Sequence, residues 1–573
     1  MERNSLGNTM KYHSKYFLKN PVYMWTLLLS AILGYGYALL HGTCGIDDIS
    51  IDLYFESGIG VAIGRWPYYL INKIIPIAKY TPFLGDAVTV LLLMASAVAG
   101  CVWLRMLTQK EMHISTYIGF SAFFLCNSMN ADIFVFYLQN GIGWVWLGTI
   151  LSLIIFFYIY KNNLHWKEQL IMRIAIIIML TISISFYESA ANIFLTGALL
   201  GIFIDLYEER DKSVFRGIHF ISSMVFVARY LIYAMVARRI IRAVIMRVFS
   251  IPAYIFYRSA TNITWLTKGG VTGIVEAIKG LLSQLYRDYF AMAVTYYPIL
   301  LFVICTIVFG VYLLWSVWKA KDGMLLLTGT GVYVSLFVLC IIEGEPMLYR
   351  ACQPFVLFVA YVFFVSINII ITRKNWIKQL ELGAVAVCLL LSIRDMNKWF
   401  ELDYDKTQYE MGIIDEIEQE LASEKYNTDE KPIVIVGKFD LPEELLDRYC
   451  IKEGETGWNI VKSAVEMSNQ KVTDSYVYGQ NSASILDWSV HAFARTCGYN
   501  VPIKQLFEYR GYNRFKWAEP QTVEKVFSIY YPLDWDYYSY TNVEVYTEQY
   551  DELEQYPYDG YIEELEDCIV IKI

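Results

Sequence analysis

The first 400 residues alternate between long apolar runs and short polar connections. An α-helix needs about 20 mostly apolar residues to cross roughly 30 Å of bilayer hydrocarbon. Eleven runs reach or approach that length, so the pattern predicts about eleven transmembrane helices. The predicted spans cover residues 22–41, 86–104, 114–127, 142–160, 169–185, 190–206, 217–235, 294–316, 323–342, 350–371 and 379–394.

Basic residues predict how these spans are oriented. Four bases precede the first span and no small-residue cleavage site follows it, which predicts an uncleaved N-terminus in the cytoplasm. The loops on that side all carry Lys or Arg, whereas the short opposite loops, 128–141 and 186–189, carry neither. An odd number of spans then places residues 396–573 outside the cell.

The segment 236–290 departs from this rule, because it is predicted to lie outside and yet is rich in Lys and Arg. Its run RRIIRAVIMRVF places Arg239, Arg242 and Arg247 among Ile and Val residues. Charge bias fades in long loops, so the predicted topology stands. Two interpretations of the run stay open: an interfacial helix packed on the membrane surface, or a binding site for a specific phospholipid substrate.

The last third of the chain has a different character. Residues 401–573 hold 35 of the 56 acidic side chains and 19 of the 46 tyrosines. The run TQYEMGIIDEIEQEL has apolar residues at helical spacing, and PIVIV (432–436) and CIVIK (568–572) are typical of buried strands. An acidic, Tyr-rich α/β domain is therefore predicted, and its side chains suit either glycan contact or an ordinary domain surface.

Composition excludes several classes of protein. Hydrophobic residues make up 56% of the chain and charged residues only 18%, against about 25% charged in soluble proteins. The net charge is −9, so no nucleic-acid partner is predicted. The predicted fold is a polytopic α-helical membrane protein with a C-terminal α/β extracytoplasmic domain. Residues 1–395 would form the membrane domain, with outer loops 42–85 and 236–290, and residues 396–573 the soluble domain.

Candidate chemistry begins in the first outer loop, GIDDISIDLYFESGIGVAIGRWPYYLI. It carries Asp47, Asp48 and Asp52, followed by Arg65 and Trp66. Adjacent carboxylates repel each other, which favours protonation of one of them. The pair could act as a general base towards a hydroxyl, or hold a divalent cation such as Mg²⁺ or Mn²⁺. A solvated turn with a helix N-cap is the structural alternative.

Further polar residues fall at the same predicted face. Tyr187 and Glu188 lie in the apolar run SISISFYESAANIF, where an ionisable group is costly without a partner or a role. GEPMLYRACQP and the loop ADIFVFYLQNG add carboxylates, an arginine and amides. From these runs the candidates are Glu343, Glu345, Arg350, Gln353, Asp132 and Gln139. The sequence does not require a cofactor, and the divalent cation stays an open alternative.

Three features together resemble the GtrII-like glucosyltransferases, a family of bacterial GT-C membrane transferases. The first is the DD pair followed by GRW at residues 64–66. The second is Tyr187-Glu188 after a serine-rich apolar run, and the third is the tail YPYDGYIEELEDCIVIKI. The resemblance spans most of the chain. It departs from the family's pattern at two points, because the family more often has Gln at the place of Glu188, and residues 50–54 lack an expected arginine.

The resemblance implies a GT-C-like membrane domain in the bacterial cytoplasmic membrane, among membrane lipids. It implies transfer of a sugar, glucose or a related hexose, from a polyprenyl-phosphate carrier to a cell-envelope polysaccharide on the outer face. Asp47 or Asp48 would be the general base. The implied phosphate-binding residues are Arg65, Arg350, Arg239 and Arg242. The implied substrate-binding residues are Asp52, Trp66, Tyr187, Glu188, Glu343, Glu345 and Gln139.

A transporter or flippase for a lipid-linked sugar or polysaccharide precursor is the alternative. Such a protein would also have about eleven spans, and repeated halves or paired broken helices are expected in it. The sequence shows no internal repeat, and its polar residues fall at the ends of the spans.

Overall fold

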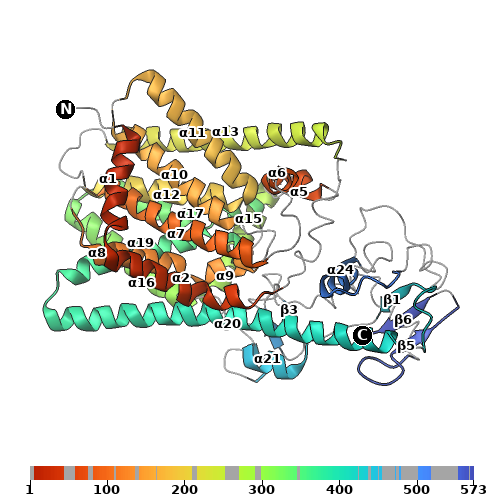
Figure 1. The fold of residues 1–573 in the computed structure, drawn as a ribbon. Coiled ribbons are helices and arrows are strands. Elements are labelled where there is room, and N and C mark those ends of the chain that lie inside the picture. The colour runs from red at the N-terminus through yellow and green to blue at the C-terminus, as the bar shows by residue number, and fades with distance from the viewer. Residues whose placement is uncertain are drawn as a thin grey trace.

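The computed structural model describes most of the membrane region and parts of the C-terminal region (Figure 1). The described residues are 5–43, 58–74, 82–108, 111–135, 141–162, 164–208, 216–251, 270–290, 299–344, 347, 349–423, 425–436, 441–449, 451–454, 471–472, 476–478, 501–517, 553–566 and 568–573.

The described part of the chain is dominated by a bundle of apolar helices. Nine of the helices described are long and apolar enough to cross a membrane, so the protein is a polytopic helical membrane protein. They are α2 (Pro21–Leu40), α7 (Pro82–Leu107), α10 (Ile142–Lys161), α11 (Trp166–Phe186), α12 (Ser189–Glu208), α13 (Arg216–Val248), α16 (Ile299–Ala320), α19 (Pro354–Ile371) and α20 (Asn375–Leu421). Shorter helices around them are α1 (Leu6–Leu18), α5 (Ile59–Ala62), α6 (Trp66–Ile74), α15 (Gly270–Phe290) and the 3-10 turn η2 (Tyr349–Ala351).

Two of the eleven predicted spans lie at breaks between short helices. The run 114–127 forms α8 (Ile114–Leu125), and α9 (Ser128–Phe134) follows it within the predicted loop 128–141. The run 323–342 forms α17 (Gly323–Ser335) and α18 (Val338–Glu343). A side chain fills each interruption. Asn130 Nδ2 donates to the Phe124 carbonyl at 2.9 Å, and Asn192 Nδ2 donates to the Leu336 carbonyl at 3.4 Å. The freed carbonyls are thus satisfied inside the protein.

Replacing Asn130 with Ala should lower the free energy of unfolding by about 1–3 kcal/mol, because the buried Phe124 carbonyl loses its donor. Thermal unfolding in detergent micelles measures the change. The matched control is Asn162→Ala at the exposed end of α10, where the Asn162 side chain also donates to a backbone carbonyl, that of Tyr158. Water can replace that donor, so equal destabilisation by the two substitutions would contradict the assigned role of Asn130.

Close packing between helices depends on small residues. Gly197 and Gly201 of α12 face Leu153 and Phe157 of α10. A Cβ atom on Gly201 would lie 2.2 Å from Cζ of Phe157, so only glycine permits this approach. Such small-residue contacts are typical of membrane helices, which gain little from the hydrophobic effect when they associate in lipid.

The loops that were predicted to lie on the N-terminal side meet at one end of the bundle. Lys161 Nζ at the end of α10 lies 3.0 Å from Asp205 Oδ1 of α12 and donates to the Leu107 carbonyl of α7 at 3.1 Å. Arg105 of α7 lies over the Tyr16 ring of α1, 4.0 Å from its centroid. We call this the N-terminal end. The other end, where α5, α6 and α9 lie, is the site end (Figure 1).

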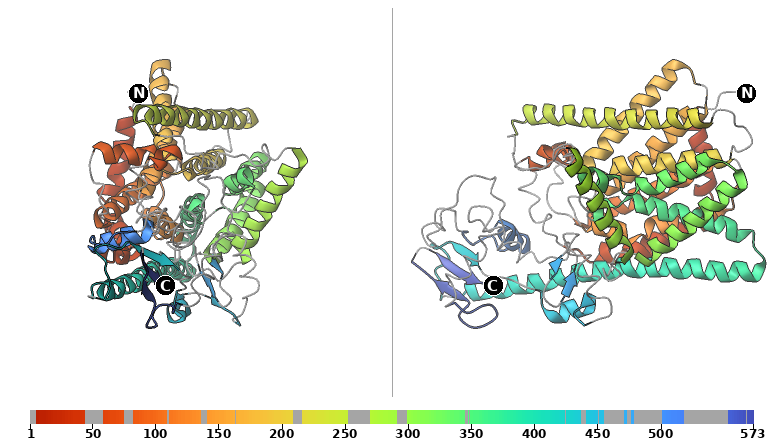
Figure 2. Two further views of the ribbon diagram at one scale, coloured as in Figure 1. Left: turned by 90° about the vertical axis from the view of Figure 1, so that its right-hand side faces the viewer. Right: turned by 180° about the vertical axis from the view of Figure 1, so that it is seen from behind.

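Helix α13 corrects the interpretation of the Arg-rich run. A span ending at residue 235 was expected, followed by a run that would either pack on the membrane surface or bind a phospholipid, but one helix of 33 residues runs from Arg216 to Val248. No Gly or Pro falls between residues 218 and 251 to end it earlier. At 1.5 Å per residue its length is about 50 Å, more than the hydrocarbon requires. Arg239 and Arg242 therefore lie on the continuation of a long helix that reaches the site end (Figure 2).

The segment 236–290 is consequently less of a loop than predicted. Besides the last turns of α13 it contains α15, which packs against α18 and α16. Ile245 of α13 packs with Val61, Trp66 and Tyr69 in a small buried cluster. This cluster ties α5 and α6 to the end of α13.

Helix α20 leads from the bundle into the C-terminal region. It runs for 47 residues, from Asn375 to Leu421, so the predicted domain boundary at residues 395–396 falls inside one continuous helix. Its length is about 70 Å. Arg510 forms a two-pronged contact with Asp415 near the helix end, with Nε to Oδ1 at 2.8 Å, and Arg514 pairs with Glu418.

The described strands all follow α20. One sheet has the order β1-β6-β5, and it contains the two strands predicted from PIVIV and CIVIK. β1 (Ile433–Val436) pairs with β6 (Ile569–Lys572) in parallel, with Ile433 opposite Ile569, and β5 (Ile562–Glu564) pairs antiparallel to β6. A small antiparallel sheet, β2-β4-β3, comprises β2 (Ile451–Lys452), β4 (Tyr476–Tyr478) and β3 (Lys471–Val472). Helices α21 (Glu443–Tyr449) and α24 (Val501–Arg510) are the described helices in this region.

Candidate functional site

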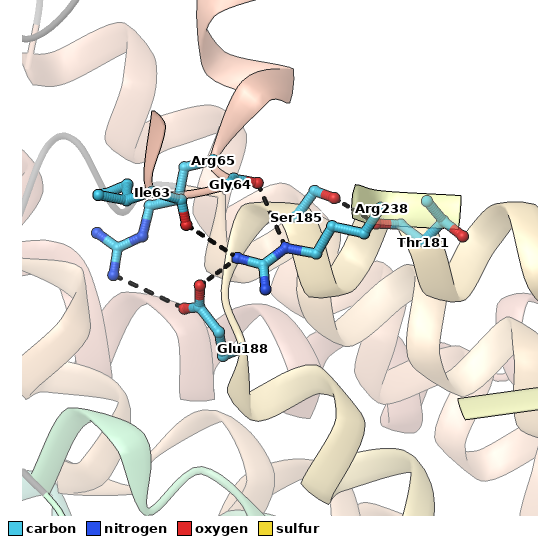
Figure 3. A network of polar contacts seen from close by, with 7 residues as sticks. All are labelled: Ile63, Gly64, Arg65, Thr181, Ser185, Glu188 and Arg238. Atoms are coloured by element: carbon cyan, nitrogen blue, oxygen red, sulfur yellow. Dashed lines mark hydrogen bonds and ion pairs between the residues drawn. The ribbon is translucent and has the colours of Figure 1, made fainter. Parts of the chain in front are cut away.

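Charged side chains from three elements converge at the site end. Arg65 lies in the turn between α5 and α6, Glu188 in the turn between α11 and α12, and Arg238 on α13 (Figure 3). Both arginines contact the same carboxylate, at Oε2 and Oε1 respectively. The three side chains together carry a net charge of +1. We call them the Arg–Glu–Arg cluster.

Arg238 is the buried member of the cluster, with 9% of its surface exposed. Its Nη2 donates to Glu188 Oε1 and to the Ile63 carbonyl at 3.2 Å. Its Nε lies 3.4 Å from the Gly64 carbonyl. A single guanidinium therefore joins the turn at residues 63–64 to the turn that carries Glu188, as Figure 3 shows.

Arg65 contacts Glu188 less closely than Arg238 does. Its Nη2 lies 3.8 Å from Glu188 Oε2, and its guanidinium lies over the Tyr187 ring, 5.3 Å from the centroid. The ion-pair distance exceeds hydrogen-bond length, and the cation–π contact orients the arginine further. The Arg65 side chain is partly exposed, so it is accessible at the site end.

The glycine of the GRW motif is required by this geometry. Gly64 has a φ of +95°, and a Cβ atom there would lie 2.5 Å from Nη2 of Arg238. The next residue but one, Trp66, begins α6 and is buried in the cluster with Ile245. In three consecutive residues the motif thus supplies the glycine of the turn, the arginine that contacts Glu188 and the buried tryptophan that begins α6.

Replacing Gly64 with Ala should reduce activity at least tenfold, because the new methyl group displaces Arg238 in addition to straining the backbone. The expected loss is measured as the initial rate of the transfer reaction that the family resemblance implies, at a fixed donor concentration. Gly454→Ala is the matched control, since Gly454 has a φ of +90° with nothing within 4 Å of the added atom. A similar loss in both variants would show that backbone strain alone is responsible.

Several charged side chains act on the hydroxyl group of Tyr187, next to the Arg–Glu–Arg cluster. Burial raises the pKa of its hydroxyl to about 12, while Arg350 and Arg65 act in the opposite direction and Glu188 and Asp132 reinforce the rise. Arg350 of η2 and Asp132 of α9 are therefore close enough to act on Tyr187. The hydroxyl stays protonated at neutral pH and is available as a hydrogen-bond donor.

Other polar side chains fix the framework. The Tyr68 hydroxyl accepts a hydrogen bond from the Gly141 backbone N–H at the start of α10, and its ring meets Phe186 edge-on at 5.0 Å. Gln353 is fully buried, with Nε2 donating to the Met129 carbonyl at 2.9 Å and Oε1 accepting from Trp146. Gln353, at the start of α19, therefore connects α19 to α9 and α10.

The structure brings some predicted site residues together and leaves others apart. Arg65, Tyr187, Glu188 and Arg350 share one neighbourhood. Arg239 is exposed and Arg242 partly exposed on the same helix as Arg238, and Glu343 is half-buried at the end of α18. The predicted residues outside the described ranges are Asp47, Asp48, Asp52, Gln139 and Glu345.

One member of this neighbourhood, Arg238, was not singled out from the sequence, and Asp132 was named as a candidate without a specific role. Arg238 stood among several similar arginines, and only the position of its helix distinguishes it. Asp132 is 5% exposed within an apolar helix, and such a residue is a signal that sequence reasoning can use. Within the described ranges, no three His, Cys, Asp or Glu side chains come together as metal ligands.

Comparison with known proteins gives one family match. A family model described as "Glucosyl transferase GtrII" matches residues 36–367, which is more than half of the chain. The matched region runs from the end of α2 into α19 and includes the Arg–Glu–Arg cluster, Asp132 and Arg350. No curated protein and no solved structure gives a significant match.

Proposed function

The chain belongs to the glucosyl transferase GtrII family, and from that premise we propose that it moves a glucosyl or related hexosyl group from a polyprenyl-phosphate carrier to a cell-envelope polysaccharide. Family membership makes the protein a membrane glucosyltransferase. The observation that carries the finer proposal is the Arg–Glu–Arg cluster with its net positive charge at the site end, where an anionic lipid headgroup would lie.

Arginines are assigned to the donor phosphate. A guanidinium presents a planar fork that matches two phosphate oxygens, which favours Arg65 and Arg350 as the direct ligands. Arg239 and Arg242 would meet headgroups along the last turns of α13. As the bond from the anomeric carbon to the phosphate oxygen breaks, the electron pair leaves with the phosphate, and these cations stabilise the developing charge.

Asp47 or Asp48 is proposed as the general base. The base takes the proton of the acceptor hydroxyl while the hydroxyl oxygen forms its bond to the anomeric carbon. Both ends of their loop are anchored at the site end: His41 after α2 lies 4.8 Å from the Tyr404 ring of α20, and Gly64 accepts from Arg238. This placement supports an acid pair on the same side as Arg65.

Sugar recognition is assigned to the remaining predicted residues and to the C-terminal region. Tyr187 can donate its hydroxyl proton, and carboxylates and amides accept from or donate to sugar hydroxyls. The residues concerned are Asp52, Trp66, Tyr187, Glu188, Glu343, Glu345 and Gln139. The acidic, Tyr-rich region after α20 would hold the acceptor glycan.

The proposed orientation follows the basic residues. We place the N-terminal end, with Arg105 and Lys161, in the cytoplasm, and the site end and the C-terminal region outside the bacterial cytoplasmic membrane. The donor phosphate and the acceptor polymer would then share the outer compartment with the cluster.

A transporter or flippase is the alternative from another class. Discontinuous helices of transporters present their freed backbone groups to the substrate or ion. Here the Phe124 and Leu336 carbonyls at the two interruptions accept hydrogen bonds from Asn130 and Asn192. This satisfied backbone, together with family membership, supports transfer over transport.

The test uses the purified protein in nanodiscs with an acceptor polysaccharide and two radiolabelled donors, polyprenyl-phosphate glucose and UDP-glucose. Label should enter the polysaccharide from the lipid donor alone. Transfer from UDP-glucose would overturn the assigned donor class. If neither donor is used while the protein moves the lipid-linked sugar across vesicle membranes, the flippase replaces the transferase.

A further inference from the structure

The Arg–Glu–Arg cluster is asymmetric. Arg238 contacts Glu188 more closely than Arg65 does and also donates to two backbone carbonyls, whereas the Arg65 Nη2 lies 3.8 Å from the carboxylate. The Arg238 side chain is 11% exposed and that of Arg65 is 20% exposed. The two arginines are therefore held with unequal strength by one shared acid.

We propose that Arg238 is a positioning residue that keeps Glu188 and the 63–64 turn in place, and that donor phosphate draws Arg65 away from Glu188. The inference rests on the proposed function, in which Arg65 meets the phosphate. It adds a division of labour: Arg238 stays with Glu188 throughout, and Arg65 exchanges one anionic partner for another.

Charge explains why the exchange is favourable. Glu188 neutralises one of the two guanidinium groups, so the cluster retains a net positive charge for an incoming anion. A phosphate offers Arg65 two oxygens at hydrogen-bond length, which is a better partner than a carboxylate oxygen 3.8 Å away. When Arg65 moves, Glu188 keeps Arg238 as its counter-ion, so the carboxylate is not left uncompensated.

The backbone explains why Arg238 is the fixed member. Its carbonyl partners belong to Ile63 and Gly64, the two residues immediately before Arg65. The helix that carries it is anchored about two turns further along, where Ile245 packs with Val61 and Trp66. Arg238 thus fixes the position of the backbone from which the Arg65 side chain extends, and it can do so without contacting the substrate.

The inference predicts opposite changes in phosphate affinity for substitutions of Glu188 and Arg238. Glu188→Gln keeps an oxygen acceptor for Arg238 but removes the charge that competes for Arg65, so phosphate should bind about threefold to tenfold more tightly. Arg238→Gln replaces the guanidinium by a shorter, neutral amide that cannot reach both carbonyls and Glu188 at once, so phosphate should bind about tenfold more weakly. Arg238→Lys supplies one ammonium group in place of a fork and should resemble Arg238→Gln more than wild type.

The experiment measures the dissociation constant of farnesyl phosphate for the full-length protein in nanodiscs, together with kcat and KM for the polyprenyl-phosphate sugar. KM should change more than kcat in the Arg238 variants, because a positioning effect acts on donor binding. Arg229→Gln is the matched control, since Arg229 is exposed on the same helix nine residues before Arg238. Thermal unfolding of each variant establishes that the fold is retained.

Each outcome decides the matter. Tighter binding by Glu188→Gln and weaker binding by Arg238→Gln support the inference. Weaker binding by Glu188→Gln would mean that Glu188 holds Arg65 for the phosphate, and unchanged binding by a folded Arg238→Gln would mean that Arg238 does not position the site; either overturns the inference alone. Absence of farnesyl phosphate binding by the wild type would overturn the proposed donor, and the inference with it.

Discussion

Replacing Asp48 with Asn should lower kcat for sugar transfer by about 10²–10⁴-fold, because the amide cannot take the proton of the acceptor hydroxyl. The change is nearly isosteric, so donor binding should be affected little. Asp47→Asn is the paired experiment, since the sequence does not distinguish the two carboxylates. The member of the pair whose loss is larger is the base.

The measurement is kcat at saturating polyprenyl-phosphate glucose and saturating acceptor, with the dissociation constant of the donor determined separately. Normal donor binding with greatly reduced kcat is the expected result for the base. If both single variants and the double variant retain wild-type kcat, the acid pair is a structural turn, and the base must be sought elsewhere at the site end. Asp132 would then be the first residue to test, because it is buried and its charge acts on Tyr187.

Replacing Arg65 with Gln should lower kcat/KM by about 10²–10³-fold, which is the cost of removing one group that stabilises charge developing in the transition state. The physical reason is the loss of the partly exposed guanidinium that would otherwise meet the leaving phosphate. Arg65→Lys should recover only part of the rate, because an ammonium group cannot bind two phosphate oxygens as a fork.

Initial rates over a range of donor concentrations give the kcat/KM of each variant. Lys73→Gln is the control for a general effect of charge, since Lys73 is exposed at the end of α6, two turns after Arg65, and carries the same charge. Equal losses in Arg65→Gln and Lys73→Gln would indicate that the surface potential matters and that Arg65 has no specific contact with the phosphate.

Much of the membrane region could be predicted from hydropathy. Nine of the predicted spans correspond to described helices that are long and apolar enough to cross a membrane, because apolar length is a property of the local sequence, and the runs 114–127 and 323–342 form shorter helices. The interruption after α8 follows from residues that were visible: Asn127 caps α9 by accepting from the Met129 N–H, and Asn130 satisfies a carbonyl of the preceding helix. Hydropathy ended the span at residue 127 and assigned residues 128–141 to a loop, so it missed the short helix α9 (Ser128–Phe134).

The site was predictable only in part. GRW and Tyr187-Glu188 could be selected because glycine, arginine and a carboxylate are conspicuous near apolar runs. The pairing of Glu188 with Arg238 could not be predicted from the sequence, because Arg238 is 50 residues away and its neighbour Arg239 is chemically identical. Adjacent helical residues point about 100° apart, so packing of α13 against α5 decides which arginine turns inward. That decision depends on tertiary structure, which no local pattern encodes.

The unbroken course of α20 makes the C-terminal region sensitive to the number of residues that precede it. Asp415 and Glu418, close to the end of the helix, contact Arg510 and Arg514, so rotation of α20 is passed directly to that region. One residue inserted into the helix after the membrane would turn the β1-β6-β5 sheet by about 100° about the helix axis. Seven inserted residues would return the sheet almost to its original rotation about the helix axis, but would place it about 10 Å further from the bilayer. The number of residues in α20 therefore sets both the rotation of the sheet about the helix axis and its distance from the bilayer.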